Sequence, residues 1–192
     1  LGGGIGRGEI TRIDDESMEM EVAIDRDPPP ALPVTLVLAL PRPKVLNRVI
    51  AAATSMGVKR IFLINSWRVE KSYWSTPRLS RENLFEQVVA GLEQARDTIP
   101  PVIETKRLFR PFVENELAGI SEGSLRLVAH PYAVDAFPPS LTGRATLAIG
   151  PDGGFIDREI ASFERIGFVP VTFGARILRV ETAVAVALGR LC

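Results

Sequence analysis

The sequence predicts an α/β fold: a mainly parallel sheet with helices on both faces. Residues 34–40 form a run that is apolar apart from Thr35, which is typical of a strand buried on both faces. Segments of helical periodicity, such as residues 180–191, alternate with predicted strands along the chain. The 192 residues are 46% hydrophobic and 24% charged, with a mean hydropathy of +0.14, so the chain can bury a sizeable core and is not mainly disordered.

Residues 1–30 predict a pair of β strands and a linker. Met18, Met20, Val22 and Ile24 alternate with other residues, the period-two pattern of a half-buried strand, and residues 8–13 are the expected partner. Two strands alone are marginally stable, so we expect the end of a small β domain whose start lies outside this chain. The stiff, proline-rich residues 27–30 place a domain boundary there, which divides the chain into residues 1–30 and 31–192.

The remaining elements follow from apolar periodicity and from stop signals. Residues 43–56 predict a helix that ends before Gly57, and residues 60–64 predict a second buried strand. Ser80 is a candidate N-cap for a helix that continues to about residue 98, just before two prolines. Further strands are predicted at residues 102–104, 125–129, 145–149 and 169–173, and further helices at residues 156–166 and 180–191.

Several classes of protein are disfavoured by composition. A single cysteine, Cys192, excludes a disulfide within the chain, and a single histidine, His130, excludes the usual zinc sites. No run approaches the ~20 apolar residues of a membrane span, and the first residues lack the pattern of a secretory signal. We therefore expect a cytoplasmic protein with no metal ion and no membrane partner.

Charge is unevenly distributed although the chain is neutral overall. Residues 31–110 carry 13 basic and 6 acidic side chains, a net charge of +7. Such a segment can attract phosphate groups. A solvated, mixed surface is the simpler interpretation of charge alone.

In parallel sheets, ligands lie beyond the carboxyl ends of the strands. Three loops of this kind are predicted, at residues 129–131, 150–154 and 174–176. Three glycines in GPDGG (150–154) let the backbone approach a ligand, although a tight turn without a ligand fits equally well. A Rossmann oxidoreductase is disfavoured, because the first strand of the sheet is followed by Pro41-Arg42-Pro43 and not by glycines.

Three segments together carry a family resemblance: LVAHPYA (127–133), LAIGPDGGF (147–155) and FGARILRVETAVAVAL (173–188). With them the chain resembles the SPOUT superfamily and, within it, the 16S ribosomal RNA uridine N3-methyltransferase family. The resemblance implies a C-terminal deep trefoil knot, the cofactor S-adenosylmethionine, a homodimer, and small-subunit ribosomal RNA or the assembled subunit as partner. Residues 1–30 are then similar to the end of that family's PUA-like RNA-binding domain.

The resemblance also implies site residues. Candidate cofactor-binding residues are His130, Ile149, Gly150, Pro151, Gly153, Gly154, Phe173, Gly174, Ile177, Leu178 and Thr182. Removal of the uridine N3 proton needs a base, or a cation that stabilises the resulting anion. Arg179 is the candidate for stabilising the uracil oxygens, and Glu181 for orienting Arg179 or accepting the proton.

Residues 67–74 interleave two tryptophans and a tyrosine with cations. This pattern suits single-stranded RNA, which binds by base stacking and phosphate contact. Arg68, Lys71 and Trp74 are the candidate RNA-binding residues, and an interface or core cluster is the alternative.

The predicted function is methylation of N3 of a uridine in 16S ribosomal RNA. Another SPOUT RNA methyltransferase, acting on a ribose 2′-oxygen or another base, is one alternative. A non-catalytic RNA-binding or ribosome-assembly module is another, although the intact GPDGG and RILRVET segments argue against it.

Overall fold

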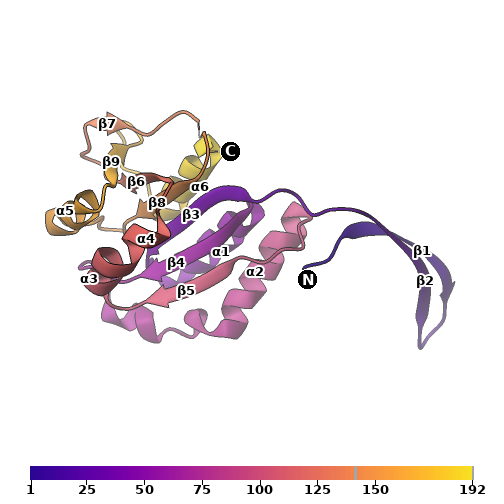
Figure 1. The fold of residues 1–192 in the computed structure, drawn as a ribbon. Helices are drawn as coiled ribbons and strands as arrows, with labels where there is room; N and C mark the ends of the chain where they lie inside the picture. Colours follow the sequence, from indigo (N-terminus) through magenta and orange to yellow (C-terminus); the bar gives the residue numbers. More distant parts are fainter. Residues whose placement is uncertain (141, 192) are drawn as a thin grey trace.

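The computed structural model describes residues 1–140 and 142–191, and its main body is a seven-stranded sheet (Figure 1). The strand order is β5-β4-β3-β8-β6-β9-β7, and every neighbouring pair runs parallel, which confirms the predicted mainly parallel sheet. The strands are β3 (Leu32–Ala39), β4 (Val58–Ile64), β5 (Val102–Lys106), β6 (Leu125–Ala129), β7 (Asp135–Ala136), β8 (Ala145–Ile149) and β9 (Val169–Thr172).

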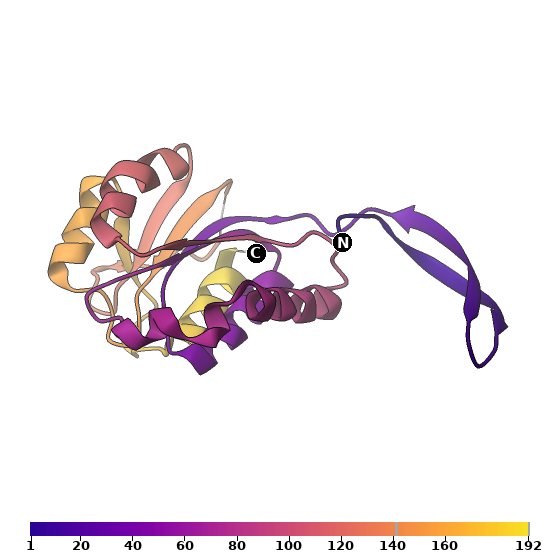
Figure 2. The same ribbon diagram turned by 90° about the horizontal axis from the view of Figure 1, so that it is seen from below.

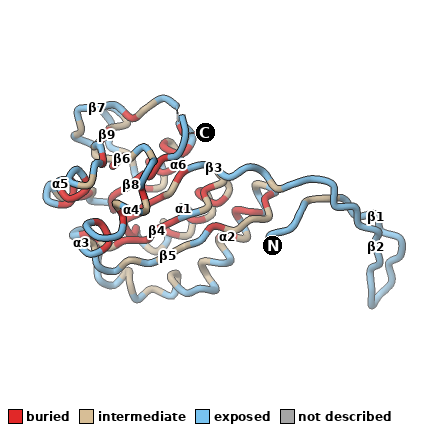
Figure 3. The backbone as a smooth tube through the Cα atoms, viewed as in Figure 1, coloured by how far each residue is buried: buried red, intermediate tan, exposed pale blue. Residues whose placement is uncertain are grey.

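The centre of the sheet holds the core because its strands are apolar on both faces. Residues 36–39 of β3 are fully buried, and all of β8 is buried beside it. Leu36 pairs with Leu147, and Leu38 pairs with Ile149. The buried residues form one cluster, and Figure 3 shows buried segments in the central strands and in the helices beside them.

Helices cover both faces of the sheet (Figure 2). One layer contains α1 (Pro43–Ser55), α2 (Arg81–Ala95) and α6 (Val180–Leu191); the other contains α3 (Phe109–Pro111), the π-helical turn η3 (Phe112–Leu117), α4 (Ala118–Ile120) and α5 (Asp157–Arg165). Two 3₁₀ turns, η1 (Lys71–Ser75) and η2 (Pro77–Leu79), connect β4 to α2. Among the described residues, no helix combines the length and the apolar character that a membrane crossing requires.

The start of α2 agrees with the prediction, but its end does not. Ser80 is the N-cap, and its hydroxyl accepts a hydrogen bond from the Asn83 N–H at 3.2 Å. The helix ends at Ala95, before the predicted residue 98, because Arg96 adopts a left-handed conformation with φ of 52°. A left-handed residue cannot continue a right-handed helix.

The N-terminal strands form a hairpin that extends away from the sheet (Figure 1). β1 (Ile5–Ile13) and β2 (Met18–Arg26) pair with each other, as predicted, and they run antiparallel. The expected half-buried face is wrong for this structure: Met18 is 51% exposed and Ile24 is 62% exposed. The physical reason is that no described element covers either face of β2.

We predict that Gly91→Ala destabilises the protein. A Cβ atom at Gly91 of α2 would lie 2.5 Å from the Ala51 carbonyl oxygen and 2.7 Å from the Thr54 Cβ, both in α1. Forcing the helices apart should lower the free energy of unfolding by about 1–3 kcal/mol, measured by urea denaturation.

Gly119→Ala in α4 is the matched control, because no atom lies within 4 Å of its added Cβ. It should leave stability unchanged or raise it by up to ~1 kcal/mol. Equal unfolding midpoints for the two variants would show that the α1–α2 contact tolerates a methyl group.

Candidate functional site

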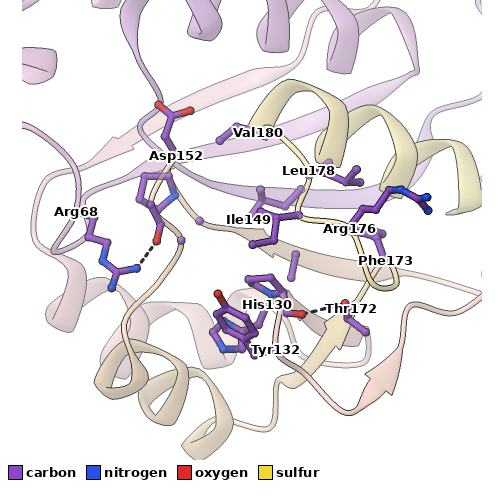
Figure 4. Close-up of a pocket in the computed structure, with 18 residues that line it drawn as sticks. Arg68, His130, Tyr132, Ile149, Asp152, Thr172, Phe173, Arg176, Leu178 and Val180 are labelled. Atoms are coloured by element: carbon purple, nitrogen blue, oxygen red, sulfur yellow. Dashed lines mark hydrogen bonds between the residues drawn. The ribbon is translucent and has the colours of Figure 1, made fainter.

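A pocket of about 320 Å³ lies at the carboxyl ends of β8, β6 and β9 (Figure 4). These strands are neighbours in the sheet and run parallel, so the loops that leave them emerge at the same edge. The pocket volume lies within the usual range for small-molecule sites, about 300–1,000 Å³. The three loops are the ones that the sequence predicts as ligand-binding.

The loop after β8 requires glycine at two positions. Gly150 is buried, and a Cβ there would lie 2.9 Å from the Phe155 nitrogen. Gly154 adopts a φ of +72°, and its N–H donates to the Pro151 carbonyl oxygen at 2.7 Å. This tight turn brings backbone atoms to the wall of the pocket.

The loop after β6 contributes a histidine and a tyrosine. The His130 backbone N–H donates to the Val171 carbonyl oxygen at 2.9 Å, which fixes the loop to β9. The His130 Nδ1 atom is buried and has no hydrogen-bond partner among the described residues. The Tyr132 ring meets the His130 ring edge-on, with centroids 5.8 Å apart, and Tyr132 remains 78% exposed. A buried unpaired ring nitrogen is costly, so a ligand that paired with it would be favoured.

The loop after β9 and the start of α6 form the apolar wall. Phe173 stacks on Phe137, with ring centroids 4.8 Å apart. Gly174 has a φ of +114°, and its N–H donates to the Thr172 hydroxyl at 3.3 Å, which turns the chain back toward the pocket. Leu178 and Val180 then face the cavity. The wall can accept a flat apolar ring.

Charged side chains reach the pocket from a more distant strand as well. Arg68, in the loop after β4, lines the pocket and donates a hydrogen bond to the Gly153 carbonyl oxygen (Figure 4). Asp152 forms an ion pair with Arg42 at 3.2 Å, and Arg176 lines the opposite side. The lining therefore includes two guanidinium groups and one carboxylate.

A buried carboxylate connects two of these loops. Glu159, in the first turn of α5, is only 6% exposed. Its Oε1 accepts the Trp67 N–H at 2.8 Å, and its Oε2 accepts the Ile156 N–H at 3.0 Å. Its position near a helix N-terminus also favours the negative charge. Glu159 thus holds the loop after β4 against the loop after β8.

Most of the predicted cofactor-binding residues lie together in the structure. The pocket is lined by His130, Ile149, Gly150, Pro151, Gly153, Gly154, Phe173, Ile177 and Leu178. Gly174 and Thr182 are not among the lining residues. Gly174 shapes the turn, and Thr182 is exposed on α6.

The predicted catalytic and RNA-binding residues are placed differently. Arg179 is exposed between two lining residues, and its carbonyl oxygen accepts the Ala183 N–H at 2.8 Å. Glu181 is half-buried in the first turn of α6. Of the predicted RNA contacts, only Arg68 lines the pocket; Lys71 is exposed and Trp74 is half-buried in η1.

Sequence reasoning missed several lining residues. The lining residues that no site prediction names are Ala129, Pro131, Tyr132, Asp152, Thr172, Arg176, Val180 and Ala183. All except Thr172, Val180 and Ala183 lie inside or directly after one of the three predicted loops, so their position is the signal that could have found them. Val180 and Ala183 are one helical turn apart, a spacing that places both on one face of α6.

The fold and pocket define the class of protein: an α/β protein with a pocket of small-molecule size at the carboxyl edge of its sheet. Ribosomal RNA small subunit methyltransferase E from Neisseria gonorrhoeae, solved bound to S-adenosyl methionine, shares the fold, with a TM-score of 0.73 and 23% identity. The match covers 95% of this chain and 75% of that structure.

The family follows from the sequence comparison. Residues 28–192 match the family described as RNA methyltransferase domain, and the chain belongs to that family. Proteins named Ribosomal RNA small subunit methyltransferase E are 31% identical in Treponema pallidum, over 81% of this chain and 60% of that protein, and 29% identical in Synechocystis, over 99% and 63%. The chain therefore spans about three fifths of the length of these relatives.

We predict that Glu159→Ala loosens both loops that the carboxylate holds. Two backbone N–H groups lose their acceptor, which should lower the free energy of unfolding by about 1–3 kcal/mol. Hydrogen exchange should also rise at residues 65–70 and 150–156. Glu159→Gln keeps one acceptor oxygen and should lose less. The role assigned to Glu159 fails if the alanine variant matches the native protein in both measurements.

Proposed function

We propose that this chain is an S-adenosylmethionine-dependent methyltransferase that methylates N3 of a uridine in 16S ribosomal RNA. The observation that supports this most is the glycine-built pocket at the carboxyl ends of β8, β6 and β9, in a chain that belongs to an RNA methyltransferase family. The curated relatives named above carry a ribosomal RNA methyltransferase name, which supports the choice of RNA.

The lining residues fit the proposed cofactor. The buried, unpaired His130 Nδ1 offers one polar partner, and the close turn of residues 150–154 offers backbone groups. The side chains of Ile149, Leu178 and Val180 offer an apolar surface for a purine ring. When bound, S-adenosylmethionine would supply a methyl group activated by a positively charged sulfur.

The chain's own residues would align the nucleotide and manage its proton. A uridine N3 atom becomes nucleophilic when its proton leaves. The Arg179 guanidinium, exposed beside the pocket, would stabilise the negative charge that develops on the uracil oxygens. Glu181, in the first turn of α6, would orient Arg179 or accept the proton, directly or through water.

The proposal also includes a knot, an RNA-binding domain at the N-terminus and the partners of the chain. The C-terminal trefoil knot that the family resemblance implies would lie at the loops after β6, β8 and β9, which meet at the pocket. The exposed apolar residues of the β1–β2 hairpin support the assignment of residues 1–30 to the C-terminal part of a PUA-like RNA-binding domain. A homodimer and small-subunit ribosomal RNA, free or assembled, complete the proposed partners.

The cofactor assignment predicts saturable binding of S-adenosylmethionine at about one site per chain, measured by calorimetry. Gly150→Ala should weaken that binding by about tenfold or more, because the new Cβ pushes the turn away from the pocket. Gly119→Ala, far from any neighbouring atom, is the control and should bind normally. A folded native chain that binds no cofactor would favour the non-catalytic RNA-binding alternative.

The catalytic assignment predicts that Arg179→Ala separates turnover from cofactor binding. Arg179 is not among the residues that line the pocket, so cofactor affinity should change little. Turnover should fall by about 100- to 1,000-fold, because one charge-stabilising donor is lost. Mass spectrometry of the digested RNA identifies the methylated nucleoside and gives the rate. Near-normal turnover would remove Arg179 from the mechanism.

A further inference from the structure

Trp67 is the most exposed tryptophan of the chain, at 74% exposure. It lies in the loop after β4, directly before Arg68, which lines the pocket. Burial of an indole is strongly favourable, so a tryptophan left in water is informative. The Trp67 side chain does not pack in the core, so it is available to contact a partner molecule.

The backbone of Trp67 is fixed although its side chain is free. Its N–H donates to the buried Glu159 carboxylate at 2.8 Å. Arg68 is bonded to the Gly153 carbonyl oxygen, and Val69 is buried with its N–H bonded to the Ser66 carbonyl oxygen at 3.1 Å. A side chain presented on a fixed backbone loses little freedom when it binds a ligand.

Trp74, the other tryptophan, is already used inside the protein. Its Nε1 donates to the Asn65 Oδ1 at 3.0 Å. The Arg107 guanidinium lies 5.3 Å from its ring centroid and also donates to its carbonyl oxygen at 3.1 Å. The residue is half-buried. The two tryptophans of the 67–74 stretch therefore have different roles, and of the two only Trp67 offers an open ring.

Three cations lie near Trp67, against two carboxylates, the exposed Glu70 and the buried Glu159. The Arg158 guanidinium lies 5.8 Å from its ring centroid, and Arg68 and Lys71 follow in the loop. Among the described residues, none of these three cations forms a salt bridge. An apolar protein surface covering Trp67 would strip water from unpaired charges, which is costly. A nucleic acid fits this surface, because its bases can stack on the exposed indole and its phosphates can pair with the cations.

We propose that Trp67 stacks on a base of the single-stranded RNA substrate, next to the nucleotide that enters the pocket. Arg158, Arg68 and Lys71 would face the phosphates on either side of that base. This inference rests on the proposed function, since it takes RNA as the substrate. It assigns the stacking role to Trp67, beside the RNA contacts expected from the sequence.

Fluorescence tests the contact directly, because the chain contains two tryptophans. The native chain, Trp74→Phe and Trp67→Phe are titrated with a uridine decamer at low salt. Stacking quenches indole emission, so the native chain and Trp74→Phe should show saturable quenching. Trp67→Phe, which retains only Trp74, should show little.

The salt dependence of affinity separates stacking from a general disturbance of the loop. Trp67→Ala should weaken binding by about 5- to 100-fold at every salt concentration, because stacking releases no counterions. The slope of log affinity against log salt should stay at its native value. Lys71→Ala, the matched cationic control, should reduce that slope by about 0.7.

Native affinity in Trp67→Ala overturns the stacking role and leaves RNA binding intact. A native chain that does not bind the decamer overturns it too. Quenching that rises with protein concentration alone, together with self-association in sedimentation, would show that a second copy covers Trp67. S-adenosylmethionine calorimetry on the native chain and on Trp67→Ala separates this inference from the proposed function. Intact cofactor binding by both, with unchanged RNA affinity in Trp67→Ala, refutes only this inference. Absence of cofactor binding by the native chain refutes the proposed function.

Discussion

The parallel alignment of β8, β6 and β9 is the constraint on which the site depends. Because these neighbouring strands run in one direction, the loops that follow them meet at one edge of the sheet. The alignment is stabilised by the buried apolar register of β3 with β8, from Val34 paired with Ala145 to Leu38 paired with Ile149. A shift of β8 by one residue would exchange the faces of its side chains and move Gly150 away from the turn it closes. The positions of the pocket residues therefore depend on the strand register of the sheet.

A second constraint joins the two halves of the sheet. The loop after β4 lies at the carboxyl edge but two strands away from β8, with β3 between them. The Glu159 carboxylate and the Arg68 side chain bridge this distance through hydrogen bonds to backbone atoms. A hydrogen bond to a backbone atom depends on where that part of the chain lies and not on which side chain it carries. They let a loop of one half contribute a charged group to a pocket built mainly by the other.

The sequence could predict elements whose signals are local. The observed bounds of β6, β8 and α6 equal the predicted residues 125–129, 145–149 and 180–191, because apolar runs with clear breaks specify them. The sequence predicts no regular element over residues 109–120, since Pro111 and a π-helical turn interrupt any regular period. Strand order is not a local property, so the arrival of Arg68 at the pocket could not be predicted. The different environments of Trp67 and Trp74 likewise arise from tertiary contacts with Glu159 and Arg107.

Charge offers the last step of this synthesis. Part of the basic excess of residues 31–110 is neutralised by carboxylates from outside that segment: Arg42 pairs with Asp152, Lys106 with Glu116, and Arg110 with Glu114. Sequence-level net charge therefore overstates the attraction for a polyanion. Arg68, Lys71 and Arg107 follow the carboxyl ends of β4 and β5, and within the described residues they form no ion pair. Parallel strands place these three cations at the same edge as the pocket, where a phosphate backbone entering the site would meet them.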